Sequence, residues 1–130
     1  MSQREIEVIL TRQLASYLAM PMFIVDPNGT LIFYNEAAEV ILGRRFEETG
    51  EMPASEWSMA FTVTDEKGVP LPPREQPLTI AFAERRPVHG RLWLRGLDQV
   101  RRLIEATCFP LIGQAGRYLG AVAITWEVKQ

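Results

Sequence analysis

The stretch that decides the fold is Met22-Phe-Ile-Val-Asp-Pro-Asn-Gly-Thr-Leu-Ile-Phe-Tyr-Asn-Glu-Ala-Ala-Glu-Val-Ile-Leu-Gly43. Its apolar runs at 22–26 and 31–34 predict two strands, joined by a tight hairpin because Asn-Gly tolerates the positive φ values that such a turn needs. Asn35 is a suitable N-cap for a helix over 36–42, and Gly43 can take the left-handed conformation that ends it. The segment therefore predicts strand, turn, strand and capped helix.

Before this segment, residues 3–19 have the pattern of an amphipathic helix. Ser2 and Glu5 have the spacing of a capping box, and Pro21 prevents the helix from continuing. Apolar residues recur at helical intervals along it, and these are Ile6, Ile9, Leu10, Leu14, Tyr17 and Leu18. Such a stripe needs a cover, which can be the domain's own sheet, a second copy of the chain, or both.

After it, residues 44–63 have poor periodicity and predict loops and short helical turns. A proline-rich segment then ends at Pro77, a favourable first position for a helix over 78–85. The last third alternates apolar and polar residues and predicts three strands, at 90–95, 102–111 and 117–128. The order of elements indicates an α+β domain with an antiparallel sheet and helices gathered on one face.

The bulk composition excludes several classes of protein. A chain of 130 residues forms one domain, and its net charge of −2 argues against a nucleic-acid partner. The apolar runs are too short to cross a bilayer, and the N-terminus lacks a signal-peptide pattern, so we expect no membrane partner. The single cysteine, Cys108, fits a reducing compartment, and we expect a cytoplasmic domain.

The order of these motifs resembles the PAS family of sensor and interaction domains. The first motif is the Asp26-Pro-Asn-Gly29 hairpin followed by Asn35-Glu-Ala-Ala and Gly43. The second is Pro70-Leu-Pro-Pro-Arg-Glu-Gln-Pro-Leu78 with Arg86-Pro-Val-His-Gly90, which is similar to a bacterial subgroup. The third is Phe109-Pro-Leu-Ile, a turn with glycine, and Gly120-Ala-Val-Ala-Ile. The resemblance as a whole covers roughly residues 14–128.

This resemblance implies the PAS fold, a five-stranded antiparallel sheet in the order 2-1-5-4-3, with helices on one face and a cavity between helices and sheet. It also implies that the N-terminal amphipathic helix lies on the other face and often forms a dimer. The chain then divides into a dimerisation helix over 1–20 and a PAS domain over 21–130.

Alternation along the last strands predicts which face of the sheet each side chain occupies. The residues expected to face the helices are Leu92, Leu94, Ile104, Ala106, Cys108, Tyr118, Val122 and Ile124. The outer face would then hold Trp93, Leu103, Phe109, Leu119, Ala121 and Ala123, a patch too apolar to remain uncovered. With the helix stripe, this predicts a dimer interface of Ile6, Ile9, Leu10, Leu14, Tyr17, Trp93, Leu103, Leu119 and Ala121.

A small-molecule cavity is the second candidate site. Its expected lining is Trp57, Met59, Phe61, Thr79, Ile80, Phe82, Leu92, Leu94, Ile104, Ala106, Cys108, Tyr118 and Val122. The alternative is that these side chains only fill the core, which normally packs to crystal-like density. Polar groups that could orient a ligand are few, with Thr79, Cys108 and Tyr118 the best placed.

The sequence gives no support for a cofactor, a metal site or catalysis. His89, the single histidine, does not match the position on the long helix of the family's haem ligand. Cys108 lies in a predicted strand and lacks the Asn-Cys-Arg-Phe-Leu motif of the flavin-binding branch, so we expect neither haem nor flavin. No catalytic triad, metal-ligand cluster or phosphate-binding glycine loop is evident.

We therefore predict a non-enzymatic PAS sensor or interaction domain in signal transduction, acting through homodimerisation and partner contacts. The alternative is a sensor whose internal cavity holds a small molecule or cofactor. The resemblance implies a histidine kinase, cyclase or transcription-regulator output, in cis or in trans. The family's usual final Asp-Ile-Thr or Asp-Val-Thr triplet is replaced here by Trp126-Glu-Val-Lys-Gln130. The sequence is thus expected to be either a stand-alone domain or the input piece of a larger sensor.

Overall fold

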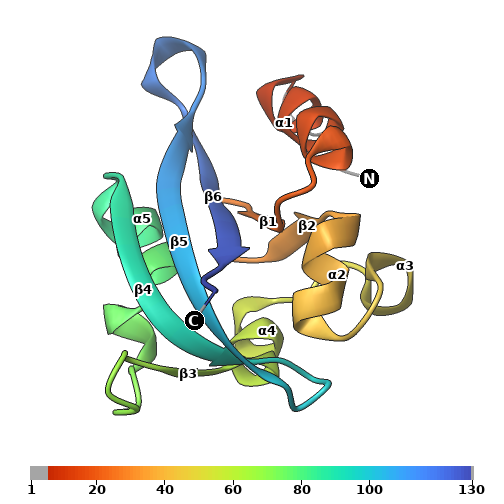
Figure 1. Cartoon of the computed structure of the whole chain (residues 1–130). Helices are drawn as coiled ribbons and strands as arrows, with labels where there is room; N and C mark the ends of the chain where they lie inside the picture. Colours follow the sequence, from red (N-terminus) through yellow and green to blue (C-terminus); the bar gives the residue numbers. More distant parts are fainter. Residues whose placement is uncertain (1–5, 130) are drawn as a thin grey trace.

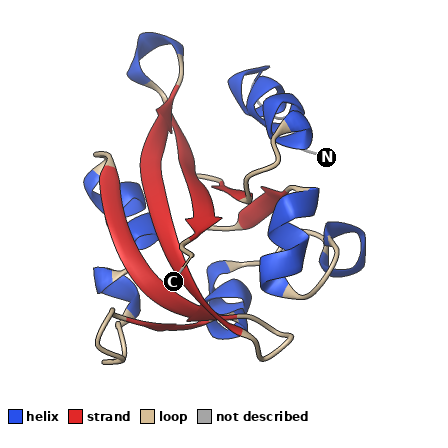
Figure 2. Ribbon diagram, viewed as in Figure 1, coloured by secondary structure: helices blue, strands red, loops and turns tan. Residues whose placement is uncertain are grey.

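The computed structural model describes residues 6–129 and shows one curled sheet with helices on both of its faces (Figures 1 and 2). The helices are α1 (Ile6–Tyr17), α2 (Glu36–Leu42), α3 (Phe46–Thr49), α4 (Ala54–Ala60) and α5 (Pro77–Glu84). The strands are β1 (Met22–Val25), β2 (Leu31–Tyr34), β3 (Thr62–Thr64), β4 (Val88–Arg95), β5 (Arg101–Ile112) and β6 (Tyr118–Glu127). Two short 3₁₀ turns, η1 (Pro73–Glu75) and η2 (Gln114–Gly116), complete the described chain.

The strand order is β2-β1-β6-β5-β4-β3, and all neighbouring strands are antiparallel. The five strands predicted from the sequence lie in the predicted order. The difference is β3, a three-residue edge strand that pairs with the end of β4 and makes the sheet six-stranded. Its sequence, Thr62-Val-Thr64, was too short for alternation to distinguish it from a loop.

The β1–β2 turn is built differently from the expected Asn-Gly hairpin. Only Gly29 has a positive φ in this turn, at 83°. The Asp26 carboxylate accepts hydrogen bonds from the backbone N–H groups of Asn28, at 2.9 Å, and Thr30, at 3.1 Å. The side chain of Asp26 therefore stabilises the turn from within, as Asp commonly does.

Asn35 has a larger role than that of a helix cap. Its Oδ1 accepts from the N–H of Ala38, which confirms the predicted N-cap of α2, and also from the N–H of Met22. Its Nδ2 donates to the carbonyl oxygens of Ala15 and Met20, both at 2.9 Å. One buried amide thus joins the end of α1, the start of β1 and the start of α2.

The inner face of the sheet packs against the helices α2 to α5. Pro77 occupies the first turn of α5, as predicted, and is itself buried. The fully or largely buried residues of this inner core are Phe23, Val25, Leu31, Tyr34, Ala38, Leu42, Met52, Ala81, Ala106, Cys108, Ala121 and Ala123. A small adjoining cluster, with Ile41, Leu92 and Ile104, extends it toward β3 and β4.

The outer face packs against α1, which stands apart from the other helices in Figure 1. Its core consists of Val8, Ala15, Met22, Ile24, Ile32, Leu119 and Val122. The half-buried Leu18, Phe33, Phe109, Leu111 and Ile124 border it. The prediction that the N-terminal helix covers the outer face is therefore confirmed over its described residues.

The predicted faces of β6 are wrong from Ala121 onward. Ile112 pairs with Tyr118 but Leu111 pairs with Gly120, so Leu119 is an extra residue in β6. One inserted residue shifts the alternation of everything that follows. Val122 and Ile124, predicted to face inward, consequently lie in the outer cluster, whereas Ala121 and Ala123 lie in the inner core.

Candidate ligand cavity and interaction surface

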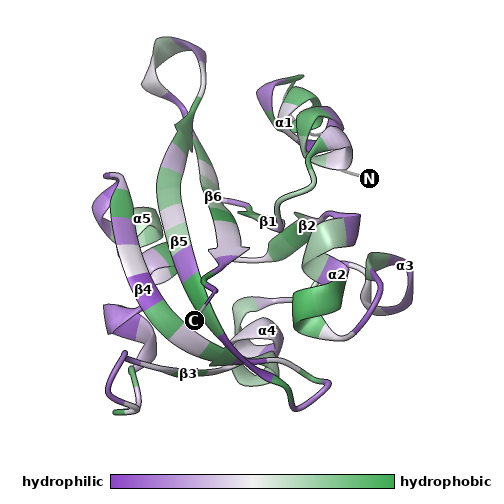
Figure 3. Ribbon diagram, viewed as in Figure 1, coloured by the Kyte–Doolittle hydropathy of each residue, from purple (hydrophilic) through white to green (hydrophobic). Residues whose placement is uncertain are grey.

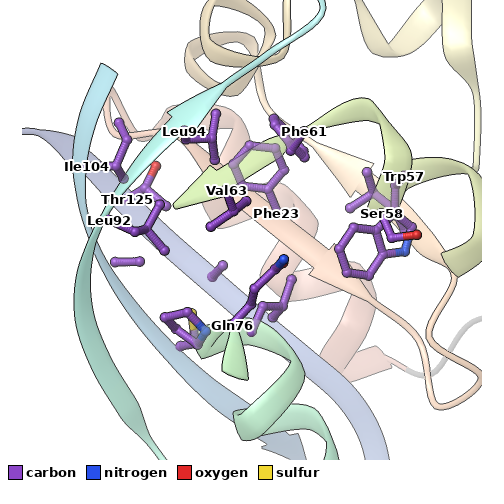
Figure 4. A pocket seen from close by; sticks show the side chains of 16 residues that line it. Phe23, Trp57, Ser58, Phe61, Val63, Gln76, Leu92, Leu94, Ile104 and Thr125 are labelled. Carbon is purple, nitrogen blue, oxygen red and sulfur yellow. The ribbon is translucent and has the colours of Figure 1, made fainter. Parts of the chain in front are cut away.

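A cavity of about 80 Å³ lies between the inner face of the sheet and the helices α4 and α5 (Figure 4). Strand residues from β1, β2, β3, β4, β5 and β6 form one wall, and residues around α4 and α5 form the other. The complete lining is Phe23, Leu31, Trp57, Ser58, Phe61, Val63, Gln76, Pro77, Leu78, Leu92, Leu94, Ile104, Ala106, Cys108, Ala123 and Thr125. The wall is therefore almost entirely apolar.

Thr125 is the most deeply buried polar side chain in this lining, with 6% of its surface exposed. Its backbone N–H donates to the carbonyl of Pro21 at 2.9 Å, and its hydroxyl lies 3.5 Å from the same oxygen. A contact of 3.5 Å is at the weak end of hydrogen-bond distances. The hydroxyl is thus the polar group best placed to bind a ligand in the cavity.

Two other polar side chains, Gln76 and Ser58, line the cavity from the helix side. The Nε2 of Gln76 donates to the carbonyl of Leu71 at 3.1 Å, which fixes the amide where α5 begins. Figure 4 shows Gln76 extending toward the hollow from below, opposite Phe23 and Val63. A few polar groups in an apolar wall are typical of sites for small organic molecules.

Cys108 lines the cavity as a neutral thiol. Burial among apolar neighbours raises the pKa of its thiol to about 12. The thiolate is the nucleophilic form of cysteine, and it is scarce at neutral pH when the pKa is this high. Cys108 therefore acts as a small apolar wall residue in this setting.

The structure brings seven of the predicted lining residues together around the cavity. These are Trp57, Phe61, Leu92, Leu94, Ile104, Ala106 and Cys108. The strand residues among them were predicted from the alternation of apolar and polar residues along β4 and β5. This alternation is reliable here because neither strand has a bulge between residues 90 and 110.

The other predicted lining residues lie elsewhere. Met59 is 84% exposed, on the side of α4 that faces away from the sheet, and Val122 is on the outer face because of the bulge. Tyr118 is on the inner side, but its hydroxyl donates to the carbonyl of Phe82 at 2.7 Å. Thr79 and Phe82 line a separate surface groove, and Ile80 belongs to neither hollow.

Several lining residues could not be identified from the sequence. Ala123 and Thr125 were assigned to the wrong face or to none, since the bulge at Leu119 has no clear sequence signal apart from Gly120. Phe23, Val63 and Gln76 come from segments whose side-chain direction depends on the curl of the sheet.

The second candidate site is the solvent side of α1. Of its residues, Val8 and Ala15 are buried against the sheet. The apolar residues on the other side are exposed, with 66% for Ile6, 41% for Ile9, 56% for Leu10, 57% for Leu14 and 87% for Tyr17. We call these five residues the α1 stripe; Figure 3 shows hydrophobic bands along this helix.

The α1 stripe coincides with the helix part of the predicted dimer interface. Its sheet part changes: Leu119 is buried beneath α1, and Ala121 faces the inner core. Trp93 and Leu103 remain on the outer face and are half-buried, and the guanidinium of Arg101 stacks over the Trp93 ring at 4.0 Å. An interface on α1 would therefore not include Leu119 or Ala121.

Polar contacts at both ends hold α1 in position. Near its start, the Glu7 carboxylate accepts from the N–H of Gln114 at the tip of the β5–β6 hairpin, at 3.1 Å. Hydrogen bonds from its own N–H and from that of Gln114, with the nearby Arg117, lower the pKa of Glu7. At its end, Asn35 binds the carbonyl of Ala15. The exposed stripe is thus presented on a fixed helix.

Beside Trp93 and Leu103, the outer surface of β4 and β5 carries charged residues. The Arg91 guanidinium pairs with the carboxylate of Glu105, and this bond raises the pKa of Arg91 and lowers that of Glu105. His89 lies in β4, where its side chain is 57% exposed, 3.8 Å from the same carboxylate, with its ring 5.8 Å from that of Trp126. His89 is therefore a surface residue on the face away from the cavity.

Two features are absent from the described residues, 6–129. Within them, no group of three or more histidine, cysteine, aspartate or glutamate residues is arranged to hold a metal ion. No helix in this part of the chain has the length and apolar character needed to cross a membrane.

Comparison with known proteins gives a consistent answer about the family. A PAS domain family model matches residues 19–127, and no curated protein matches the sequence.

Solved structures of low sequence identity have the same fold. The PAS domain of nitrogen regulation protein NR(II) from Vibrio parahaemolyticus is 16% identical with a TM-score of 0.66, covering 92% of this chain and 98% of that one. The PAS domain of BvgS from Bordetella pertussis is 15% identical with a TM-score of 0.70, covering 97% and 89%. The LOV protein of Rhodobacter sphaeroides is 12% identical with a TM-score of 0.71, covering 97% and 70%.

Proposed function

The chain belongs to the PAS domain family, whose members are signalling sensor modules, and from that premise we propose that it acts as a homodimer, without catalysis of its own. In this proposal α1 forms the dimer contact and the remainder of the domain controls how α1 is held. The signal passes to a signalling partner, such as a histidine kinase, cyclase or transcription regulator, in cis or in trans.

The α1 stripe is the observation that carries this proposal. Large apolar side chains scattered singly on a surface are ordinary, but contiguous ones mark interaction sites. Ile6, Leu10, Leu14 and Tyr17 follow each other at intervals of three or four residues, so they form one continuous row on the helix. Burying a row of this kind against a second copy stabilises the dimer by ~1.5–3 kcal/mol per side chain before entropy costs.

A charge placed within the stripe tests the proposal. Leu14→Glu puts a carboxylate where an apolar contact is proposed, and desolvating that charge should prevent dimerisation. Val40→Glu adds the same charge at an apolar residue that is 65% exposed on α2, outside the stripe, and serves as the matched control. Sedimentation velocity should show that Leu14→Glu raises the dimer dissociation constant at least about a hundredfold, whereas Val40→Glu changes it less than threefold. Equal effects of the two substitutions would contradict the proposal.

The cavity supports a second candidate function, that of a ligand-binding sensor. β1 connects the two sites physically, since Phe23 lines the cavity while Met22 and Ile24 on the same strand lie beneath α1. Thr125 also lines the cavity, and it holds Pro21 in the segment between α1 and β1. A ligand that drew the Thr125 hydroxyl away from Pro21 would alter the support of α1.

Native mass spectrometry of the freshly purified protein tests this second function. A bound small molecule that dissociates on denaturation would support it. A spectrum with the mass of the polypeptide alone, under conditions that preserve known complexes, would count against a tightly held ligand.

We propose no resident haem or flavin. His89 lies on the outer face, away from the cavity, and Cys108 is a neutral wall residue in a strand. An absorbance spectrum above 350 nm tests this directly, since either cofactor would give a visible band. The buried, reduced Cys108 is also the reason for proposing the cytoplasm as the compartment.

A further inference from the structure

A second hollow lies next to the cavity and shares a wall with it. It is an open surface groove of about 360 Å³, formed where the β1–β2 turn meets α4 and α5. Its lining is Val25, Asn28, Gly29, Ala54, Ser55, Trp57, Ser58, Pro73, Leu78, Thr79 and Phe82. Trp57, Ser58 and Leu78 line both hollows, so these three side chains form the partition between groove and cavity.

Trp57 is by far the largest of the three, and its polar atom is bonded on the groove side. The indole Nε1–H donates to the carbonyl of Gly29 in the β1–β2 turn at 2.8 Å. Figure 4 shows the indole at the edge of the hollow, on the side of α4. One hydrogen bond therefore fixes the orientation of the main partition residue.

The helix that carries Trp57 is short, and its contacts with the inner core are only half-buried. α4 has seven residues, none of which is fully buried, and its N-cap Pro53 provides no side-chain hydrogen bond. Helices with few buried apolar contacts lie at the low end of local stability and open before the rest of a domain. Movement of α4 or of the indole alone is thus the least costly way to open the cavity.

The small volume of the cavity means that a larger ligand could enter only if the indole moved. The cavity of about 80 Å³ is smaller than the ~150 Å³ engineered cavity that binds benzene. Only a molecule of a few heavy atoms fits while the indole is in place. If the indole swings toward solvent, cavity and groove become one apolar hollow that reaches the surface.

We propose that Trp57 is the gate of this cavity, and that the groove is the entrance for a small, flat, apolar ring compound. In the closed state the indole and its bond to Gly29 separate the two hollows. In the open state the ring of the ligand takes the space that the indole leaves, against Phe23, Phe61 and Leu92. This inference rests on the second candidate function, and it names the route and the class of ligand.

Cys108 provides a probe that does not depend on any ligand. It is the single cysteine of the chain, it is 1% exposed, and it lines the cavity behind Trp57. Methyl methanethiosulfonate is small enough to pass an open gate; the thiolate attacks its sulfenyl sulfur, a mixed disulfide forms and methanesulfinate leaves. The rate of this reaction under native conditions reports how often the cavity opens.

Trp57→Phe removes the hydrogen-bond donor and keeps an aromatic ring in the partition. Losing one net hydrogen bond of this kind should raise the open population about five- to tenfold, and the labelling rate with it. Ile32→Val is the matched control, because Ile32 is buried in the outer core, on the face of the sheet opposite the cavity, and the substitution destabilises the fold. If the gate is real, Trp57→Phe accelerates labelling by more than its loss of unfolding stability explains, and Ile32→Val does not.

Two results would overturn the proposal. Equal acceleration by the two variants, after correction for their unfolding free energies, would mean that Cys108 is reached only through global unfolding and that no gate exists. The ligand class is tested with toluene, which should slow Cys108 labelling of the wild-type protein in a saturable manner. Labelling unaffected by saturating toluene would overturn the ligand class, even if Trp57→Phe behaves as a gate variant. Neither result depends on the dimer, so failure here is distinguishable from failure of the α1 proposal.

Discussion

The two faces of the sheet are covered in different ways. The inner face lies under helices from the middle of the chain, and it retains a cavity between those helices and the sheet. The outer face lies under α1, which buries Val8 and Ala15 against the sheet but leaves the α1 stripe in solvent. The inner face thus has room for something small inside the domain, whereas the outer face has an apolar surface that suits something large outside it.

This contrast assigns different tasks to the two faces. An internal cavity selects by volume and a few polar groups, which suits a small molecule. A row of large apolar side chains on a rigid helix selects by shape and area, which suits another protein surface. Because β1 and β6 have side chains in both cores, each face can affect the other through the same strands.

The largest loss of stability should come from a substitution at Gly120, in the β6 bulge that sets which residues face each side of the sheet. Gly120 has φ +123° at the bulge, and a Cβ there would lie 1.9 Å from the carbonyl oxygen of Val25. We expect Gly120→Ala to destabilise the domain by more than about 3 kcal/mol, measured by urea unfolding. Gly116→Ala, in the same hairpin but with open space around it, should cost about 1 kcal/mol. Similar costs at both positions would contradict this, because they would show that the close approach of Gly120 to the Val25 carbonyl does not limit the stability of the domain.

Asn35 joins the two faces, and its loss should have the next largest effect. Asn35→Ala leaves several buried backbone groups without their partner, and we expect a loss of about 3 kcal/mol. Asn35→Asp retains the cap of α2 but turns a carboxylate toward the carbonyls of Ala15 and Met20, so it should release α1 selectively. Hydrogen exchange should then be faster in α1 and unchanged in α2. Uniform acceleration in both helices would refute this division of roles.

The packing of the two cores should respond oppositely to added volume. Ala106→Val fills part of the inner cavity with a residue suited to strands, and we expect a gain of about 1 kcal/mol. Val122→Ile enlarges a fully buried residue of the outer core and should cost about 1–2 kcal/mol. Urea unfolding of both variants measures this. A cost for Ala106→Val as large as that for Val122→Ile would mean that the inner cavity is not usable space.

The smallest effect concerns pH and the attachment of α1 to the β5–β6 hairpin. The pKa of Glu7 is lowered from its ordinary value of 4.5, so the carboxylate stabilises the folded state above that value and the contribution disappears as the pH falls through the folded pKa. The Gln114 amide should therefore exchange at a pH-corrected rate that is constant from pH 8 to about pH 5 and rises at lower pH. Glu7→Gln should remove this dependence; if the variant retains it, another group is responsible.

Much of the fold could be predicted from the sequence because local signals and alternation agree along most of the chain. Asn35, Gly43 and Pro77 mark helix ends by mechanisms that act within a few residues. β3 was missed, although Asp65-Glu-Lys-Gly68 has the spacing of Asp26-Pro-Asn-Gly29 and forms the same kind of turn. That repeated spacing is a signal that could have predicted the strand.

The candidate sites were harder to predict, for two physical reasons. The bulge at Leu119 changes the face of every later residue in β6, and a glycine alone does not specify a bulge. In α1 both sides carry apolar residues, and the side with the small Ala15 packs on the sheet because it allows close approach. Which side of α1 faces the sheet depends on the shape of the sheet, and the periodicity of the sequence contains no information about that shape.

The central claim is that the α1 stripe is covered by a second copy of the chain. Sedimentation equilibrium of the wild-type protein over a dilution series tests it most directly, since the mass of one chain is 14.8 kDa. We expect a mass of twice that value, 29.6 kDa, at tens of micromolar, decreasing toward 14.8 kDa on dilution. A mass of 14.8 kDa that does not change up to the highest concentration would contradict it.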